Sequence, residues 1–177
     1  MPAVLLCEPL RDIDPERTMS TTTPLLALYR RFEPLPLGRW LFSRAVCFKA
    51  PYFGTIHPTF VALEPGRCEA RIPHRRGMQN HIGSVHAIAL CNLAELCAGV
   101  MTDASLPKGM RWIPKGMEVQ YLKKAMGPQH GVATPRIPLV ESATGYDLPV
   151  DVEVRDADGA VVFRAAVTMW LSPKPAR

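Results

Sequence analysis

The sequence has no C-x-x-C pair, although five of its 177 residues are cysteines. Because the cysteines are single and odd in number, neither a zinc site nor a framework of disulfide bonds is predicted. Cys91 and Cys97 fall in an apolar segment and are expected to be small core residues. A reducing compartment suits this pattern, and we expect the protein to be cytoplasmic.

A secretory signal and a membrane-spanning run are also lacking. The apolar run from Pro2 to Cys7 is short, has no basic residues before it and is followed by Glu8 and Arg11, so it does not match a signal peptide. No uninterrupted apolar stretch reaches the roughly 20 residues of a membrane-spanning helix. We therefore expect residues 1–17 to be a flexible leader and the protein to have no membrane span.

Long blocks of like charge are absent, although the net charge is +5. A nucleic-acid-binding tail usually carries about five or more like charges in a row, so no nucleic-acid partner is predicted. Neither G-x-x-x-x-G-K-[ST] nor G-x-G-x-x-G is present. A small ligand that carries phosphate groups suits the positive charge better.

The rest of the composition is that of one folded domain. Hydrophobic residues make up 47% and charged residues 21%, which is ordinary for a globular protein. A chain of this length can bury a substantial core, and its 18 prolines predict short elements separated by turns. We expect a single domain over residues 18–172 and a tail at 173–177.

Hydrophobic periodicity predicts a helix over residues 23–32, which begins with an N-cap threonine and a first-turn proline. The mixed stretch 39–48 is interpreted as a strand or extended segment. Residues 55–63 and 68–72 are predicted to be strands joined by a turn.

A long helix is predicted from Ser84, its N-cap, to about Met101. Its apolar residues cover more than one face, so it should be largely buried. About four strands follow by alternation, at 117–121, 131–139, 150–155 and 161–169. Strands on both sides of one buried helix indicate the α+β class. An antiparallel sheet wrapped around one long buried helix, with an extra N-terminal helix, is the hotdog fold.

A carboxylate inside the long helix indicates acyl-transfer chemistry. The first N–H groups of a helix and its positive dipole end can stabilise an oxyanion. Glu95 lies nine residues after His86, about two and a half turns along the helix, and no Lys or Arg stands three or four residues away to pair with it. Glu95 is therefore a candidate base or nucleophile, with a solvated position at the rim as the alternative.

The residues before Glu95 also have two interpretations each. Asn80 can orient water or a carbonyl through its amide, or it can form a turn. Gly83 lets the backbone approach a ligand, although glycine is common before helices. His86, placed in the first turn, is expected to be neutral because the dipole disfavours its cation, and it can donate one hydrogen bond or simply pack.

Two other kinds of site are not supported. Ser84 and His86 are two residues apart and do not face each other on a helix, and no G-x-S-x-G elbow of a serine hydrolase is present. The set of His74, His81, His86 and Glu95 matches no common metal-ligand spacing, so no metal is predicted.

Four motifs resemble, in order, a bacterial branch of thioesterase-like proteins of unknown function. They are P-Y-F-G-T-I-H-P (51–58), N-H-I-G-S-V-H-A (80–87), N-L-A-E (92–95) and R-W-I-P-K-G-M-E-V-Q-Y-L-K-K-A (111–125), and the similarity covers about residues 20–172. The spacing of Asn80, Gly83, His86 and Glu95 also resembles that of hotdog acyl-CoA thioesterases of the phenylacetate-pathway type.

The resemblance implies hydrolysis of an acyl thioester, with coenzyme A or an acyl carrier protein as the leaving group. Coenzyme A is then part of the substrate, and no separate cofactor is implied. Glu95 would be the general base or nucleophile, the amide near Ala87 or Ile88 would stabilise the oxyanion, and Asn80 and His86 would orient water or thioester. A homodimer, or a dimer of dimers, with the active site at the subunit interface is implied.

Two basic pairs, one helix and one loop are expected to surround the substrate. The pairs Arg75-Arg76 and Lys123-Lys124 are candidates for the phosphates of coenzyme A, with solvated loop and strand ends as the alternative. Helix 23–32 and loop 102–116 are expected to shape the pocket.

One departure from the resembled pattern keeps other functions open. Many phenylacetate-type enzymes have two glycines after the histidine, where this chain has Ala87 and Ile88. The backbone donor survives, but the side chains narrow the pocket, which favours a non-catalytic acyl-CoA or acyl-carrier binding module as a second hypothesis. A dehydratase is a third, and it requires the side chains of Glu95 and His86 to converge. The fold alone does not choose among them.

Overall fold

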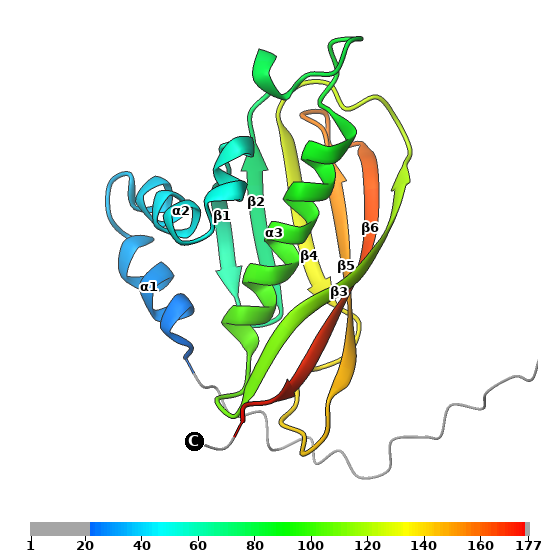
Figure 1. The fold of residues 1–177 in the computed structure, drawn as a ribbon. Coiled ribbons are helices and arrows are strands. Elements are labelled where there is room, and N and C mark those ends of the chain that lie inside the picture. The colour runs from blue at the N-terminus through cyan, green and yellow to red at the C-terminus, as the bar shows by residue number, and fades with distance from the viewer. Residues whose placement is uncertain (1–21, 176–177) are drawn as a thin grey trace, which may run out of the picture.

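The computed structural model describes residues 22–175. The predicted leader, residues 1–17, and the end of the predicted tail lie outside the described residues. Six strands, three α-helices and short 3-10 turns follow one another along this described part of the chain (Figure 1). In order, they are α1 (Pro24–Phe32), α2 (Gly38–Lys49), η2 (Pro51–Ile56), β1 (Thr59–Glu64), β2 (Arg67–Ile72), η3 (Arg76–Met78), α3 (Ala87–Ser105), β3 (Met110–Tyr121), β4 (Gln129–Pro135), β5 (Tyr146–Arg155) and β6 (Val161–Pro173).

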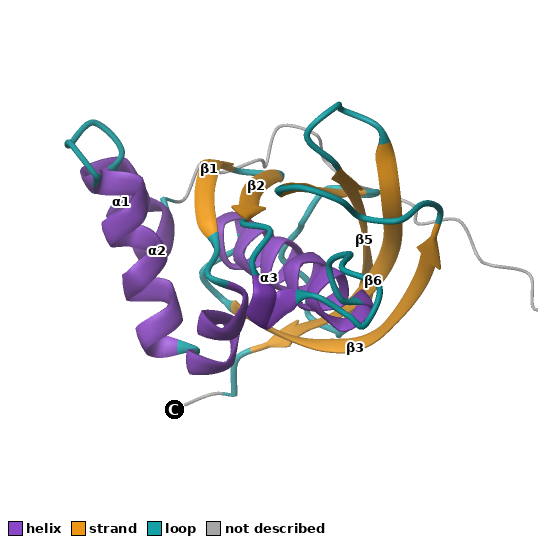
Figure 2. Ribbon diagram, turned by 90° about the horizontal axis from the view of Figure 1, so that it is seen from above, coloured by secondary structure: helices purple, strands orange, loops and turns teal. Residues whose placement is uncertain are grey.

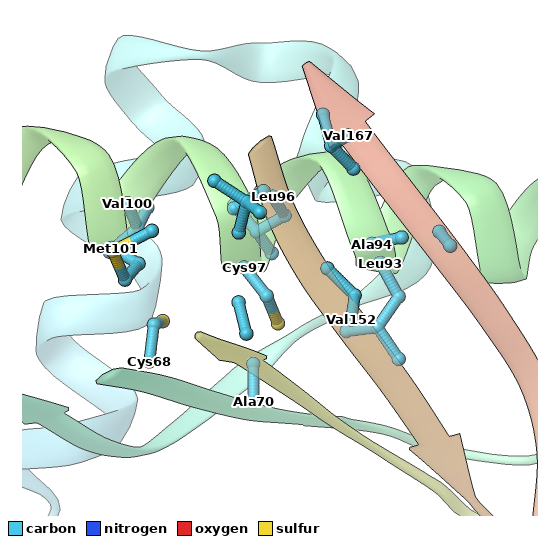
Figure 3. Packing of buried hydrophobic residues seen from close by; sticks show 14 of the residues in the cluster. Cys68, Ala70, Leu93, Ala94, Leu96, Cys97, Val100, Met101, Val152 and Val167 are labelled. Atoms are coloured by element: carbon cyan, nitrogen blue, oxygen red, sulfur yellow. The ribbon is translucent and has the colours of Figure 1, made fainter. Parts of the chain in front are cut away.

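The strands form one antiparallel sheet in the order β1-β2-β4-β5-β6-β3, which curves around α3 (Figure 2). Leu93 and Cys97 of α3 face the sheet, where Ala70 and Val152 are fully buried (Figure 3). Gly131 of β4 lets the helix come close, since a Cβ there would lie 3.0 Å from the Leu93 side chain. The predicted hotdog fold is confirmed.

Helix α3 is the core of the molecule. It has 19 residues and contains an 18-residue stretch with a mean hydropathy of 1.4, so by length and composition it passes as a membrane span, the one such helix among residues 22–175. Length and composition by themselves therefore do not exclude a membrane-spanning helix at Ala87–Ser105. The sheet encloses most of α3, however, and its buried residues belong to the hydrophobic core. It is the core helix of the domain.

The predicted strand at 39–48 is wrong, because this stretch is the helix α2. Phe42 is buried, while Trp40, Leu41 and Phe48 are exposed, so apolar residues lie on several sides and the helical period is weak. Tertiary contacts hold the helix in place: Ser43 Oγ accepts a hydrogen bond from Phe60 N of β1 (2.9 Å).

The predicted helix at 23–32 is confirmed as α1, whose N-cap Thr23 accepts a hydrogen bond from Leu26 N (3.3 Å). Tyr29 of α1 meets Phe42 of α2 edge to face, with ring centroids 5.1 Å apart. These two helices lie beside the sheet rather than over its outer face (Figure 2).

Several element boundaries differ from those predicted. The segment 51–56 is the turn η2, so the first strand starts at Thr59. The long helix continues to Ser105, and β3 starts at Met110, so the predicted loop 102–116 is mostly helix and strand. Proline ends β4 at Pro135, since proline cannot donate to the ladder.

Candidate functional site

His86 caps the N-terminus of α3. The predictions that Ser84 is the N-cap and that His86 lies in the first turn are therefore wrong. His86 Nδ1 accepts a hydrogen bond from Ile88 N (3.1 Å), so the ring proton is on Nε2. Ala87 N has no hydrogen-bond acceptor within the described range 22–175. Of the two amides predicted to stabilise an oxyanion, that of Ile88 is engaged and that of Ala87 is available.

The loop before α3 uses its polar side chains internally. Asn80 Oδ1 accepts from Ile82 N (3.1 Å) and Ser84 N (3.2 Å), and Asn80 Nδ2 donates to Ser84 Oγ (2.8 Å). Gly83 has φ +80°, a conformation that glycine adopts readily. Ser84 is buried in this network, which explains why it does not cap the helix. In one chain, Asn80 and Gly83 shape the loop that presents His86.

Glu95 lies on the one stripe of α3 that the sheet leaves open. This stripe contains Ile88, Cys91 and Glu95, which are spaced three and four residues apart and are exposed or partly exposed. Most of the remaining helix is buried. Within residues 22–175, no hydrogen bond or ion pair is found for the Glu95 carboxylate. In a single chain the carboxylate is therefore exposed, with no side-chain or backbone partner within residues 22–175.

The two ends of the predicted machinery are far apart in one chain. Ala87 and Glu95 are eight residues apart in α3, which places them about 12 Å apart along the helix axis. A single thioester carbonyl cannot contact both at hydrogen-bond distance. Likewise, the side chains of His86 and Glu95 start more than two turns apart.

Two polar contacts near Glu95 were not predicted from the sequence. Asn92, one turn before Glu95, is 6% exposed and donates from Nδ2 to Thr55 Oγ1 of η2 (3.3 Å). Cys91 Sγ lies 3.1 Å from Tyr121 Oη of β3. This contact, together with partial burial, raises the pKa of Tyr121 to about 12. In the sequence, Asn92 and Cys91 stand three and four residues before Glu95, which places them next to it on the helix surface; this spacing was the available signal for them.

A cavity of about 940 Å³ opens beside the Glu95 stripe. Its floor is α3, one wall is β3 and the other wall is built by α1, α2 and η2. Most of its lining is apolar and includes Leu25, Leu28, Val46, Phe53, Leu96 and Trp112. Helix 23–32 was expected to shape a pocket, and it contributes Leu25 and Leu28.

The two basic pairs lie at the end of the molecule where α3 begins. Arg75 and Arg76 are exposed at η3, and Lys123 and Lys124 are exposed after β3. Backbone hydrogen bonds connect these segments to the loop before α3: His86 N donates to Met78 O (2.7 Å), and Val85 N donates to Ala125 O (2.9 Å). The tertiary structure thus brings both pairs to one end of α3.

No metal centre is indicated by the described part of the chain. Within residues 22–175, no three His, Cys, Asp or Glu side chains lie close enough together to hold a metal ion.

Known proteins resemble this chain in family and in fold. The family model described as a domain of unknown function, DUF4442, matches residues 38–171. The crystal structure of a structural-genomics protein called APC5556 is 43% identical, with a TM-score of 0.73 over 85% of this chain and 99% of that one. No curated protein matches the chain.

Two more distant structures have thioesterase names. A thioesterase from Haemophilus influenzae (HI1161) is 15% identical, with a TM-score of 0.63 over 73% of this chain and 87% of that one. A thioesterase family protein from Silicibacter pomeroyi is 17% identical, with a TM-score of 0.61 over 75% and 96%. At these identities the likeness shows the fold, which is the hotdog fold of thioesterase-family proteins.

Proposed function

This chain belongs to the DUF4442 family and has the fold of thioesterase-family hotdog proteins, and we propose that it hydrolyses acyl thioesters of coenzyme A. The observation that carries the proposal is Glu95, an unpaired, exposed carboxylate on a helix that is otherwise the buried core. No partner that would give it a role in holding the fold together is found among residues 22–175.

In the proposed reaction, Glu95 is the general base. It takes a proton from water as the water oxygen attacks the thioester carbonyl carbon. The oxyanion of the tetrahedral intermediate accepts a hydrogen bond from Ala87 N–H, at the positive end of the α3 dipole. Collapse breaks the C–S bond, and the proton returns from Glu95 to the sulfur, which leaves as a free thiol beside a carboxylic acid.

His86 and Asn80 are assigned supporting roles. With Nδ1 occupied by Ile88 N, the remaining Nε2–H of His86 is a donor that can orient the thioester oxygen. Asn80 keeps the loop shape that presents His86 and Ala87, through its contacts with Ser84 and Ile82. Direct contact of the Asn80 amide with substrate is not needed for this role.

The separation of about 12 Å between Ala87 and Glu95 favours a site shared by two subunits. In a two-fold dimer with antiparallel α3 helices, Glu95 of the partner subunit would approach the N-terminus of α3. β3 is one of the two edge strands of the described sheet, and two large exposed residues, Ile88 on the open stripe and Tyr121 in contact with Cys91, lie there. A homodimer would cover them, and such dimers can pair again.

The leaving group is proposed to be coenzyme A, with acyl carrier protein as the alternative carrier. Both carry phosphate, and the basic pairs at 75–76 and 123–124 lie at the end of α3 where the thioester would react. Cytoplasm, where such thioesters are made and used, is the proposed location.

A non-catalytic binding module is the second candidate function. Ile88 is 55% exposed beside the available Ala87 amide, where its side chain restricts the approach of substrate. A dehydratase is less well supported, since His86 and Glu95 are more than two turns apart in one chain and do not converge within it.

The test is free-thiol release from acyl-CoAs of short, medium and long chain and from an aryl acyl-CoA. We expect turnover to fall at least a hundredfold in Glu95→Gln, with unchanged unfolding in urea. Glu118→Gln, which alters an exposed carboxylate on β3, is the matched control and should keep full activity. Equal activity of Glu95→Gln and the native protein would refute the assignment of Glu95.

If no acyl-CoA is hydrolysed, acyl carrier protein thioesters are tested next. Binding without turnover of either carrier would favour the module. Light scattering checks the dimer, and Ile88→Lys is expected to give monomers that have lost activity.

A further inference from the structure

We propose that the cavity between α1, α2, α3 and β3 binds the acyl chain of the substrate, and that this chain is aliphatic and of medium to long length. The inference rests on the proposed function and adds the substrate class. It assigns a purpose to α1, which precedes the part of the chain matched by the family model.

The cavity begins at the proposed catalytic group and follows the helix away from the oxyanion end. Its floor on α3 consists of Glu95, Leu96, Gly99, Val100 and Asp103, residues that share one helical face. From the first to the last is eight residues, or about 12 Å along the axis. That is close to the length of an extended decanoyl chain.

The walls are apolar and come from elements far apart in the sequence. Leu25 and Leu28 of α1, Val46 of α2 and Phe53 of η2 face the cavity from one side, and Trp112 of β3 from the other. The volume of about 940 Å³ is at the upper end of the roughly 300–1,000 Å³ common for ligand sites. An acetyl group would leave most of this apolar surface uncovered, whereas a long alkyl chain would bury it.

Two polar side chains at the far end of the cavity are already hydrogen-bonded. Asp103 Oδ1 accepts from Trp112 Nε1 (3.3 Å), and Lys174 Nζ donates to Lys108 O (2.7 Å). The polar lining groups without a bonded partner within residues 22–175 include the ammonium groups of Lys49 and Lys108, which belong to exposed residues, so the interior favours a plain hydrocarbon.

The rim of the cavity is cationic. Lys49, Lys108 and Lys174 line it and are exposed, against the carboxylates of Glu95 and Asp103. An apolar interior with a basic rim is complementary to an anionic amphiphile, and a long-chain acyl-CoA is such a molecule.

The wall facing α3 is a fixed part of the fold. Tyr29 of α1 is buried against Phe42 and donates from Oη to Val61 O of β1 (3.2 Å). On the other side of α2, Ser43 is bonded to Phe60 of β1. The cavity is therefore preformed, and an acyl chain can enter it without the cost of ordering its walls.

The experiment measures binding by calorimetry with thioether analogues of acetyl-CoA and decanoyl-CoA, which cannot be hydrolysed. Ala45→Trp fills the cavity, because Ala45 of α2 lines it. Ala27→Trp is the matched control, since Ala27 is exposed on α1 and does not line it. We expect the native protein to bind the decanoyl analogue at least tenfold more tightly than the acetyl analogue. Ala45→Trp should abolish this preference, and Ala27→Trp should keep it.

Leu28→Lys guards against a folding defect in Ala45→Trp, because Leu28 is 37% exposed and tolerates a longer polar side chain. Leu28→Lys should weaken binding of the decanoyl analogue and leave binding of the acetyl analogue unchanged. Equal affinities for the two analogues in the native protein, or an unchanged decanoyl preference in both cavity variants, would overturn the inference.

This outcome is separable from the failure of the proposed function. A decanoyl preference that both cavity variants remove, in a protein without turnover, would support the acyl site and refute the hydrolase. Turnover that is insensitive to chain length and to Ala45→Trp would refute the acyl site and support the hydrolase.

Discussion

Asn92 of α3 donates a hydrogen bond from Nδ2 to Thr55 Oγ1 of η2 over 3.3 Å, and Thr55 Oγ1 in turn donates to Tyr52 O over 2.8 Å. The chain of bonds fastens η2 to the core helix one turn before Glu95. Asn92 Oδ1 is buried and has no partner within residues 22–175. The Asn92 side chain therefore stabilises the fold through its bonded Nδ2 and destabilises it through its buried, unbonded Oδ1.

This arrangement predicts that Thr55→Val is more destabilising than Asn92→Leu. Thr55→Val leaves both polar atoms of the buried amide without a partner, which costs about 1–3 kcal/mol. Asn92→Leu removes the amide together with its unpaired oxygen, and should cost less than about 1 kcal/mol. Urea unfolding of both variants measures the two free energies, and the reverse order would contradict this account of Asn92.

Substitutions of His86 should separate capping from chemistry. His86→Ala removes the side chain that caps α3 through Nδ1, and should cost about 1 kcal/mol of stability. His86→Asn should recover most of that loss, because asparagine is a good N-cap. Thiol release should stay low in both variants, since neither has an Nε2–H donor. Full activity of His86→Asn would show that capping is the whole role of His86.

Tyr29 predicts a specific loss of stability in alkali. Burial and the hydrogen bond to Glu33 raise its pKa from the ordinary value of 10.0 to about 12. Between these values the unfolded chain loses the Tyr29 proton and the folded protein keeps it, so the stabilising effect is complete below pH 10 and is lost as the pH rises toward 12.

Tyr29→Phe isolates this effect. At pH 7 the variant should be less stable than the native protein by about 1 kcal/mol, for the lost hydrogen bonds. The difference should shrink as urea unfolding is repeated at increasing pH above 10, since phenylalanine does not titrate. A constant difference up to pH 11 would argue against the raised pKa.

Gly99 and Trp112 should be coupled. A Cβ on Gly99 would lie 2.9 Å from the Trp112 ring, and the hydrogen bond to Asp103 holds that ring in place. Gly99→Ala should cost about 1–3 kcal/mol by overpacking, despite the better helix propensity of alanine. In a Trp112→Phe background the same change should be near neutral or stabilising by up to about 1 kcal/mol. Additive effects in a double-mutant cycle would exclude this contact.

Local signals made part of the fold predictable. The strands β5 and β6 alternate between buried and less buried residues over most of their length. They are joined by the turn Asp156–Gly159, in which Asp156 Oδ1 accepts from Asp158 N and Ala160 N. Helix α1 has its own cap and first-turn proline. Such signals act between residues close in sequence, so no knowledge of distant contacts is needed to use them.

Helix α2 shows where local signals fail. Its apolar residues lie on several sides, because it packs on α1 and β1 with one face and leaves Trp40, Leu41 and Phe48 exposed with the others. The first residues of α3 show the same limit. Ser84 is as good an N-cap as any by type, but its hydroxyl is taken by Asn80, and His86 caps the helix instead.

The sequence by itself determined the hotdog order of elements, the long apolar helix and Glu95 as the carboxylate within it, because periodicity and an uncompensated charge are properties of neighbouring residues. Only the tertiary structure decided that Glu95 lies on the open stripe of α3, that Ala87 rather than Ile88 keeps a free amide, and that a cavity lies beside the stripe. Those features depend on which surfaces meet, and Leu28, Val46 and Trp112 become neighbours only when α1, α2 and β3 pack around α3.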